Sequence, residues 1–160
     1  MATYHEDLSV RFFDLSKQLL LSSSPLRFEF PQPLPHLTIP IRQIIHDETL
    51  TGIFGREAIR IQSVHLSSDS LECMIVLNTG AVLVYRFAAA RGRPQTLELG
   101  DLDDLLNDEE DIIVSLADLA SWSSDGFKPV CVIDARRGVV TQAKMSNTGM
   151  CLNVFACFHG

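Results

Sequence analysis

The residues of this chain best suited to chemistry are carboxylates gathered in one segment. Residues 98–111 carry eight Asp or Glu side chains in fourteen positions. The segment lacks the glycine and terminal glutamate spacing of an EF-hand loop, so it does not predict a calcium site. Its default interpretation is a solvated loop between strands; the alternative is an electrostatic contact that steers a basic partner at long range. Such a partner-binding loop would consist of Asp101, Asp103, Asp104, Asp108, Glu109, Glu110 and Asp111.

The other candidate ligands and nucleophiles have no spacing that predicts a catalytic, cofactor or metal site. The sequence contains no HExxH, CxxC or GxSxG pattern and no glycine-rich phosphate loop. Nothing places an activated serine or cysteine beside a base, so we expect a protein that is not an enzyme. The side chains considered are His5, His36, His46, His65, His159, Cys73, Cys131, Cys151 and Cys157.

Composition predicts a globular, soluble, intracellular protein. Hydrophobic residues make up 46% of the chain and charged residues 21%, which is typical of a folded domain. The net charge of −7 disfavours nucleic acid and anionic membranes as direct partners, because both require neutralisation by Lys or Arg. No apolar run approaches the roughly 18–20 residues that a membrane helix needs. Any membrane association is therefore expected to be peripheral.

The middle of the chain has the pattern of consecutive antiparallel strands. Apolar residues alternate near 59–64, and two β-rich runs, 72–77 and 81–87, flank the turn Asn78-Thr79-Gly80. A short Asn/Gly-containing loop between two such runs predicts a β-hairpin. The valine- and isoleucine-rich run 127–134 is expected to be the outer, fourth strand of this unit. The insertion before it has a short helix predicted at 102–107, and 111–120 is left unassigned.

Residues 5–14, HEDLSVRFFD, resemble the end of a WD-type repeat, with an acidic turn followed by a strand. Val10 and Phe12 share one face of this strand, because strand side chains alternate. Leu8 stands where such repeats usually have glycine, whose permissive φ suits a tight turn. WD repeats build β-propellers, so the predicted fold is all-β: an incomplete WD40-type propeller of about two blades.

Several polar and aromatic residues have expected structural roles. By analogy with WD repeats, side chains near the turns are expected to hold strands together through hydrogen bonds; these are His5, Asp7, Asp14 and Asp134. Trp122 and Phe127 flank a Ser-Ser-Asp-Gly turn and are expected to pack this loop back on the sheet. An exposed aromatic hot spot is the alternative for this pair.

The chain divides into five regions on these grounds. They are the terminal strand of a preceding blade (1–16), a proline-rich connector (17–57) with a short edge piece at 37–41, one blade (58–134) with the acidic insertion (88–126), the start of the next blade (135–149), and an aberrant tail (150–160). We expect the tail to be translated intron in a truncated gene product.

Three stretches carry a resemblance to a known family. They are GFKPVCVIDARRGVVTQAKMSNTG (126–149), HEDLSVRFFD (5–14) and SVHLSSDSLECMIVLNTGAVLVYRF (63–87). The chain resembles fungal members of the lethal giant larvae/tomosyn family over most of its length, near the start of the second propeller. The resemblance implies a cytoplasmic scaffold that binds SNAREs and Rab-type GTPases and regulates polarised exocytosis and vesicle fusion. Contact with the plasma membrane would then be peripheral and through these partners.

Two alternatives to that function remain open. The first is a generic WD-repeat adaptor in another pathway, with the same blades and different partners. The second is a truncated gene product without a function of its own.

Overall fold

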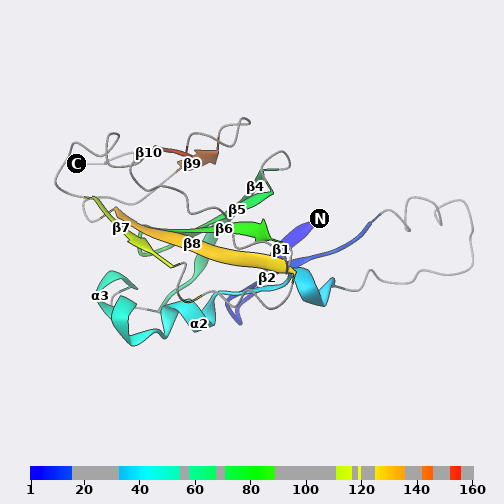
Figure 1. Cartoon of the computed structure of the whole chain (residues 1–160), viewed down its shortest axis with the longest axis horizontal. Helices are drawn as coiled ribbons and strands as arrows, with labels where there is room; N and C mark the ends of the chain where they lie inside the picture. The colour runs from blue at the N-terminus through cyan, green and yellow to red at the C-terminus, as the bar shows by residue number, and fades with distance from the viewer. Residues whose placement is uncertain are drawn as a thin grey trace, which may run out of the picture.

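The computed structural model describes residues 1–15, 33–54, 58–67, 71–88, 111–116, 119, 125–135, 142–145 and 152–155. The described residues are mostly β. They form a five-stranded sheet, a three-stranded sheet and a two-stranded hairpin, with a few short helices (Figure 1). All strand pairs are antiparallel. The predicted all-β class is therefore confirmed.

The five-stranded sheet follows chain order except at one edge. Its strands are β4 (Ile61–Ser67), β5 (Glu72–Leu77), β6 (Ala81–Ala88), β7 (Asp111–Ser115) and β8 (Gly126–Ala135), in the order β4-β5-β6-β8-β7. β8 pairs with β6 and therefore takes the fourth position in the sheet, as predicted. It is not the edge strand, however, because β7 lies outside it. β7 pairs along its far side, with Val114 opposite Val132. The β-branched residues Ile112, Ile113 and Val114 suit a strand that covers an open sheet edge.

The turn between β5 and β6 is the hairpin that the Asn78-Thr79-Gly80 sequence predicts. Gly80 has a φ of 88° and donates its N–H to the Leu77 carbonyl at 3.0 Å. The Asn78 side chain accepts a hydrogen bond from the Arg60 N–H at 2.7 Å and donates one to the Ala58 carbonyl at 3.0 Å. The turn thereby also fixes the segment that leads into β4.

β8 tolerates a proline in its interior because the ladder is irregular there. Val84 stands opposite Cys131 and Tyr85 opposite Pro129, so Val130 has no direct partner on β6. Proline lacks the N–H of a ladder bond and is accommodated within sheets at such bulges. The Val130 carbonyl instead accepts the Leu116 N–H at 2.8 Å, just after β7 ends.

The N-terminal part forms a second, smaller layer. Its elements are β1 (Ala2–Tyr4), β2 (Ser9–Phe12), η1 (Pro35–Leu37), β3 (Ile39–Pro40), α2 (Arg42–Ile45), η2 (Glu48–Leu50) and α3 (Thr51–Phe54). The sheet order is β1-β2-β3, so the edge piece expected at 37–41 exists. The helices α2 and α3 were not predicted, and they give the described part of the connector a structure of its own.

Two apolar clusters cover the two faces of the five-stranded sheet. One face packs against the N-terminal layer, in a cluster that includes Ile75, Leu83 and Tyr85 of the sheet together with Val10, Phe12, Ile39, Ile44 and Phe54. The other face carries Met74, Val76, Val82, Val84, Cys131 and Ile133. Every residue of β5 is buried, which explains why this strand reads as a continuous apolar run.

The last described strands form a separate hairpin. β9 (Gln142–Met145) pairs with β10 (Leu152–Phe155), and Lys144 stands opposite Asn153. In Figure 1 this hairpin lies on the side of the five-stranded sheet opposite α2 and α3. Its nearest described neighbour is β4. Residues 152–155 of the region expected to be a tail thus form a strand.

Candidate interaction groove

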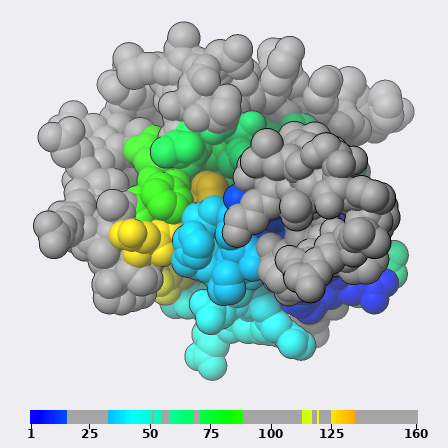
Figure 2. All heavy atoms as spheres, turned by 90° about the vertical axis from the view of Figure 1, so that its right-hand side faces the viewer, coloured from blue at the N-terminus to red at the C-terminus, as the bar shows by residue number. Residues whose placement is uncertain are grey.

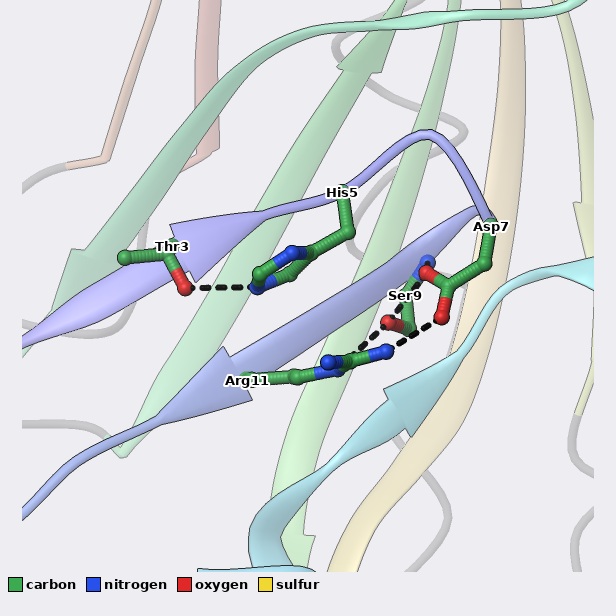
Figure 3. A network of polar contacts seen from close by, with 5 residues as sticks. All are labelled: Thr3, His5, Asp7, Ser9 and Arg11. Atoms are coloured by element: carbon green, nitrogen blue, oxygen red, sulfur yellow. Dashed lines mark hydrogen bonds and ion pairs between the residues drawn. The ribbon is translucent and has the colours of Figure 1, made fainter. Parts of the chain in front are cut away.

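The turn between β1 and β2 holds a compact network of polar side chains (Figure 3). Asp7 Oδ1 accepts hydrogen bonds from the Ser9 N–H at 3.1 Å and the Ser9 hydroxyl at 2.6 Å, and Oδ2 pairs with Arg11. The Ser9 hydroxyl and the Arg11 guanidinium lower the pKa of Asp7. Asp7 therefore orders the turn and the start of β2, but these contacts are all to β2 itself and, contrary to the expectation, do not link two strands. The His5 ring lies 2.9 Å from the Thr3 hydroxyl of its own strand and bridges no other strand by a described contact.

Leu8 occupies the position where this turn favours glycine. Its φ is 60°, and its N–H donates to the His5 carbonyl at 3.1 Å. This geometry is that of a hairpin loop whose last residue has the left-handed helical backbone conformation. The Leu8 side chain is half-buried and packs against the core cluster, which offsets part of the backbone strain.

A groove of about 570 Å³ lies between the segment 35–47 and the first residues of β8. η1, β3 and α2 form one wall, and β6 and β8 form the other. In Figure 2 the cyan residues of the first wall lie against the yellow residues of β8. The lining residues that matter below are Gln43, Ile44, Asp47, Tyr85, Asp125 and Phe127.

Gly126 joins the two walls of the groove at one end. Its φ is +144°, and an added Cβ would lie 2.7 Å from the His36 carbonyl oxygen. Backbone approaches backbone here with no room for a side chain, so glycine is required. This contact holds η1 against the start of β8.

Phe127 packs inward beside the groove. Its ring stacks on Phe12 with centroids 5.0 Å apart and planes 15° apart, and it meets Phe87 edge-on at 5.8 Å. Aromatic pairs in such arrangements contribute about 0.5–1.5 kcal/mol beyond their buried area. Phe127 thus packs from strand β8 itself against Phe12 and Phe87, and the expected packing of the loop before it stays a prediction because Trp122 lies outside the described residues.

Tyr85 lines the groove with a hydroxyl that has no hydrogen-bond partner among the described residues. The residue is only 3% exposed. Burial raises the pKa of this phenol, and the nearby Cys73 raises it further. A buried hydroxyl left unpaired costs about 1–3 kcal/mol.

Two carboxylates give the groove its charge. The Asp47 carboxylate accepts hydrogen bonds from the Thr49 N–H at 2.9 Å and from the Thr49 hydroxyl, and these bonds lower its pKa. Asp125 lines the same groove directly before Gly126. Lys128 also contributes to the lining, but it stands opposite Arg86 in the ladder, so its side chain is directed to the other face of the sheet.

Comparison with known families gives one match. The family model "Lethal giant larvae(Lgl) like, C-terminal" matches residues 58–155. The chain belongs to the lethal giant larvae family. Neither the curated proteins nor the solved structures gave a significant match.

The lethal giant larvae region coincides with two structural units. It begins just before β4 and ends with the last residue of β10. It therefore contains the whole five-stranded sheet and the β9–β10 hairpin, while β1, β2, β3 and the short helices precede it. The match also includes six residues of the predicted tail, 150–155.

The acidic residues predicted as a partner contact lie almost entirely outside the described residues of this lethal giant larvae chain. Asp111 is the exception, and it begins β7 opposite Ala135.

Among the described residues, no group of three or more His, Cys, Asp or Glu side chains is placed to hold a metal ion. No helix in the described part is long and apolar enough to span a membrane.

No local pattern in the sequence indicates the groove, because its walls are far apart in the chain. Asp47 and Asp125 are separated by the whole of the first three sheet strands, and no local motif links them. The one available signal was Gly126, a glycine directly before a strand. It marks a close approach of two backbones, but it does not say which segment approaches.

Proposed function

We propose that this chain is a non-enzymatic scaffold that binds SNAREs and/or Rab-type GTPases and regulates polarised exocytosis. The match to the lethal giant larvae family over residues 58–155 carries the proposal. The protein would work in the cytoplasm and reach the plasma membrane only through its partners.

We further propose that the sheet is a blade of a WD-type propeller. A propeller blade is a four-stranded antiparallel sheet. The neighbouring strands β4, β5, β6 and β8 occur in this order along the chain, with the insertion that carries β7 between the last two. Rigid blades of this kind present loops to partners while the core stays unchanged.

The described thiols support a binding role rather than nucleophilic catalysis. Burial raises the pKa of Cys73 to about 12 and that of Cys131 to about 11. A nucleophilic cysteine needs the opposite shift, because the thiolate is the reactive form. Both side chains behave as apolar core residues.

A pull-down of purified partners by the intact chain tests the binding proposal. The immobilised chain is incubated with plasma-membrane SNAREs and, separately, with Rab-type GTPases loaded with GTP or GDP. Recovery of a SNARE or of a nucleotide-dependent Rab supports the proposal. Failure to recover either, with a chain shown to be folded by circular dichroism, would leave the generic WD adaptor as the better description.

Association kinetics measured with a recovered partner test the acidic segment. A variant with Asp103→Asn, Asp104→Asn, Glu109→Gln and Glu110→Gln should bind its partner more slowly, and its binding should depend less on salt. Unchanged association rates at low ionic strength would show that this segment is a solvated loop.

A further inference from the structure

We propose that the groove between α2 and β8 is a docking site for an extended partner segment that carries a Lys or Arg beside an apolar side chain. This inference rests on the proposed scaffold role and assigns it a surface and a ligand chemistry. It does not depend on which protein supplies the segment.

The base of the groove fits an apolar side chain. Ile44 and Phe127 line it from opposite walls, and the buried Tyr85, whose hydroxyl has no partner in the described part of the chain, also lines it. The volume of about 570 Å³ falls in the range of about 300–1,000 Å³ typical of ligand sites.

The charge of the groove selects a basic segment. Asp47 lines it with a carboxylate that Thr49 hydrogen-bonds without neutralising its charge, and the side chain of Lys128 is directed to the other face of the sheet. The chain as a whole carries a net charge of −7, so the surrounding field favours a cationic ligand. An acidic segment would meet like charge at Asp47.

The groove is also formed before any ligand binds. The backbones of Gly126 and His36 approach each other closely across the two walls, and Phe127 of one wall stacks on Phe12 of β2, the strand that pairs with β3 of the other wall. A preformed site loses less conformational entropy on binding than one that must be ordered. An extended segment can lie along such a surface.

The test starts from a defined probe. A displayed library of random twelve-residue peptides is selected on the intact chain, and the most enriched peptide is synthesised and titrated by fluorescence anisotropy. We expect the enriched peptides to share a Lys or Arg next to an apolar residue. A selection that yields no common sequence, or acidic peptides, would overturn the proposal.

Two matched substitutions on α2 locate the binding site. Gln43 lines the groove and the neighbouring Arg42 does not, although both are exposed. Gln43→Trp should fill the groove and weaken peptide binding by at least about tenfold, whereas Arg42→Trp should change it by less than about twofold. Equal effects of the two substitutions would place the peptide elsewhere and refute the docking site.

Asp47→Asn tests the charge alone. Asparagine keeps the acceptor oxygen that Thr49 uses, so the local turn is retained while the carboxylate is lost. We expect roughly three- to tenfold weaker binding with a flatter salt dependence, compared with Glu6→Gln as a charge-matched control outside the groove. Equal binding by these two variants would contradict the ion pair. Because no SNARE or Rab is present, a failure here leaves the pull-down result intact.

Discussion

Leu8 and Leu71 are held at positive φ, 60° and 53°, a conformation that costs a residue with a side chain about 1–2 kcal/mol. Both leucines lie in turns that precede a strand. Leu8 recovers part of the cost because its side chain packs on the core. Leu71 is 52% exposed and has far less packing to offset the strain. Its backbone carbonyl accepts the Phe87 N–H at 2.9 Å, which keeps the turn in place.

Leu71→Gly should therefore stabilise the protein. Glycine adopts positive φ without steric cost, so the free energy of unfolding should rise by about 1 kcal/mol in urea titrations. Leu66→Gly is the matched control, since Leu66 is also 52% exposed but lies in β4. Glycine within a strand should lower the stability by about 0.5–1 kcal/mol. A loss of stability in both variants would contradict the strain at Leu71.

The buried thiols predict a loss of stability at alkaline pH. An unfolded thiol ionises near pH 8.5, whereas in the folded chain the pKa is raised to about 12 at Cys73 and to about 11 at Cys131. Their contribution is complete below about pH 8.5 and is lost as the pH rises toward the folded values. Urea unfolding at pH 7 and 9.5 measures this loss, which should shrink in the double variant Cys73→Val, Cys131→Val. An equal loss in that variant would assign the effect to other groups.

At the scale of elements, an ion pair links β5 and β6 where the two strands stand opposite each other. Arg86 Nε donates to Glu72 Oε1 at 2.8 Å, and the carboxylate side chain is only 8% exposed. Removing one member of a buried pair costs more than the pair itself contributes, because the remaining charge stays buried. Removing either side chain should therefore destabilise the fold mainly because the other charge is left buried without its partner.

Arg86→Met should lower the free energy of unfolding by about 2 kcal/mol, less than for a fully buried pair because Arg86 remains 26% exposed. The double variant Glu72→Met, Arg86→Met should recover most of this loss, since no charge remains without a partner. Chemical unfolding of the three proteins gives the comparison. A double variant less stable than Arg86→Met would show that the ion pair itself holds the strands together.

Gly126→Ala should separate η1 from β8. The new Cβ would meet the His36 carbonyl oxygen at 2.7 Å, and the residue would keep an unfavourable φ, so a loss of about 2 kcal/mol or more is expected. Gly52→Ala is the control, because no atom lies within 4 Å of its added Cβ and alanine favours the helix α3. Thermal melts of both variants decide the point: a similar change in Tm would mean that the η1–β8 contact is not essential.

The sequence predicted the elements that depend on local pattern. β4, β5 and β6 follow from alternation and from the Asn78-Thr79-Gly80 turn, and the shared face of Val10 and Phe12 was also predicted correctly, since both are buried. α2 was missed because Pro35 and Pro40 dominate its surroundings and it has only four residues. β7 was left open because an acidic run precedes it directly. Its pairing with β8 depends on a long-range contact that no local pattern encodes.

At the scale of the whole molecule, the family region and the N-terminal layer share one core. The lethal giant larvae match covers residues 58–155. Yet Ile75, Leu83 and Tyr85 of its sheet pack against Val10 and Phe12, which precede that region. The groove is likewise built by both parts of the chain, because one of its walls belongs to the N-terminal layer and the other to the five-stranded sheet. The surface proposed to bind partners therefore depends on residues that the family match does not include.

The most direct measurement of the central claim is a crystal structure of the intact chain. In a propeller, neighbouring blades pack face to face and do not share ladder hydrogen bonds. We predict the strand order β4-β5-β6-β8-β7, with the β9–β10 hairpin packed beside it as part of the next blade. Ladder hydrogen bonds between β9 and β4, closing the strands into one continuous barrel, would contradict the assignment of this sheet as a propeller blade.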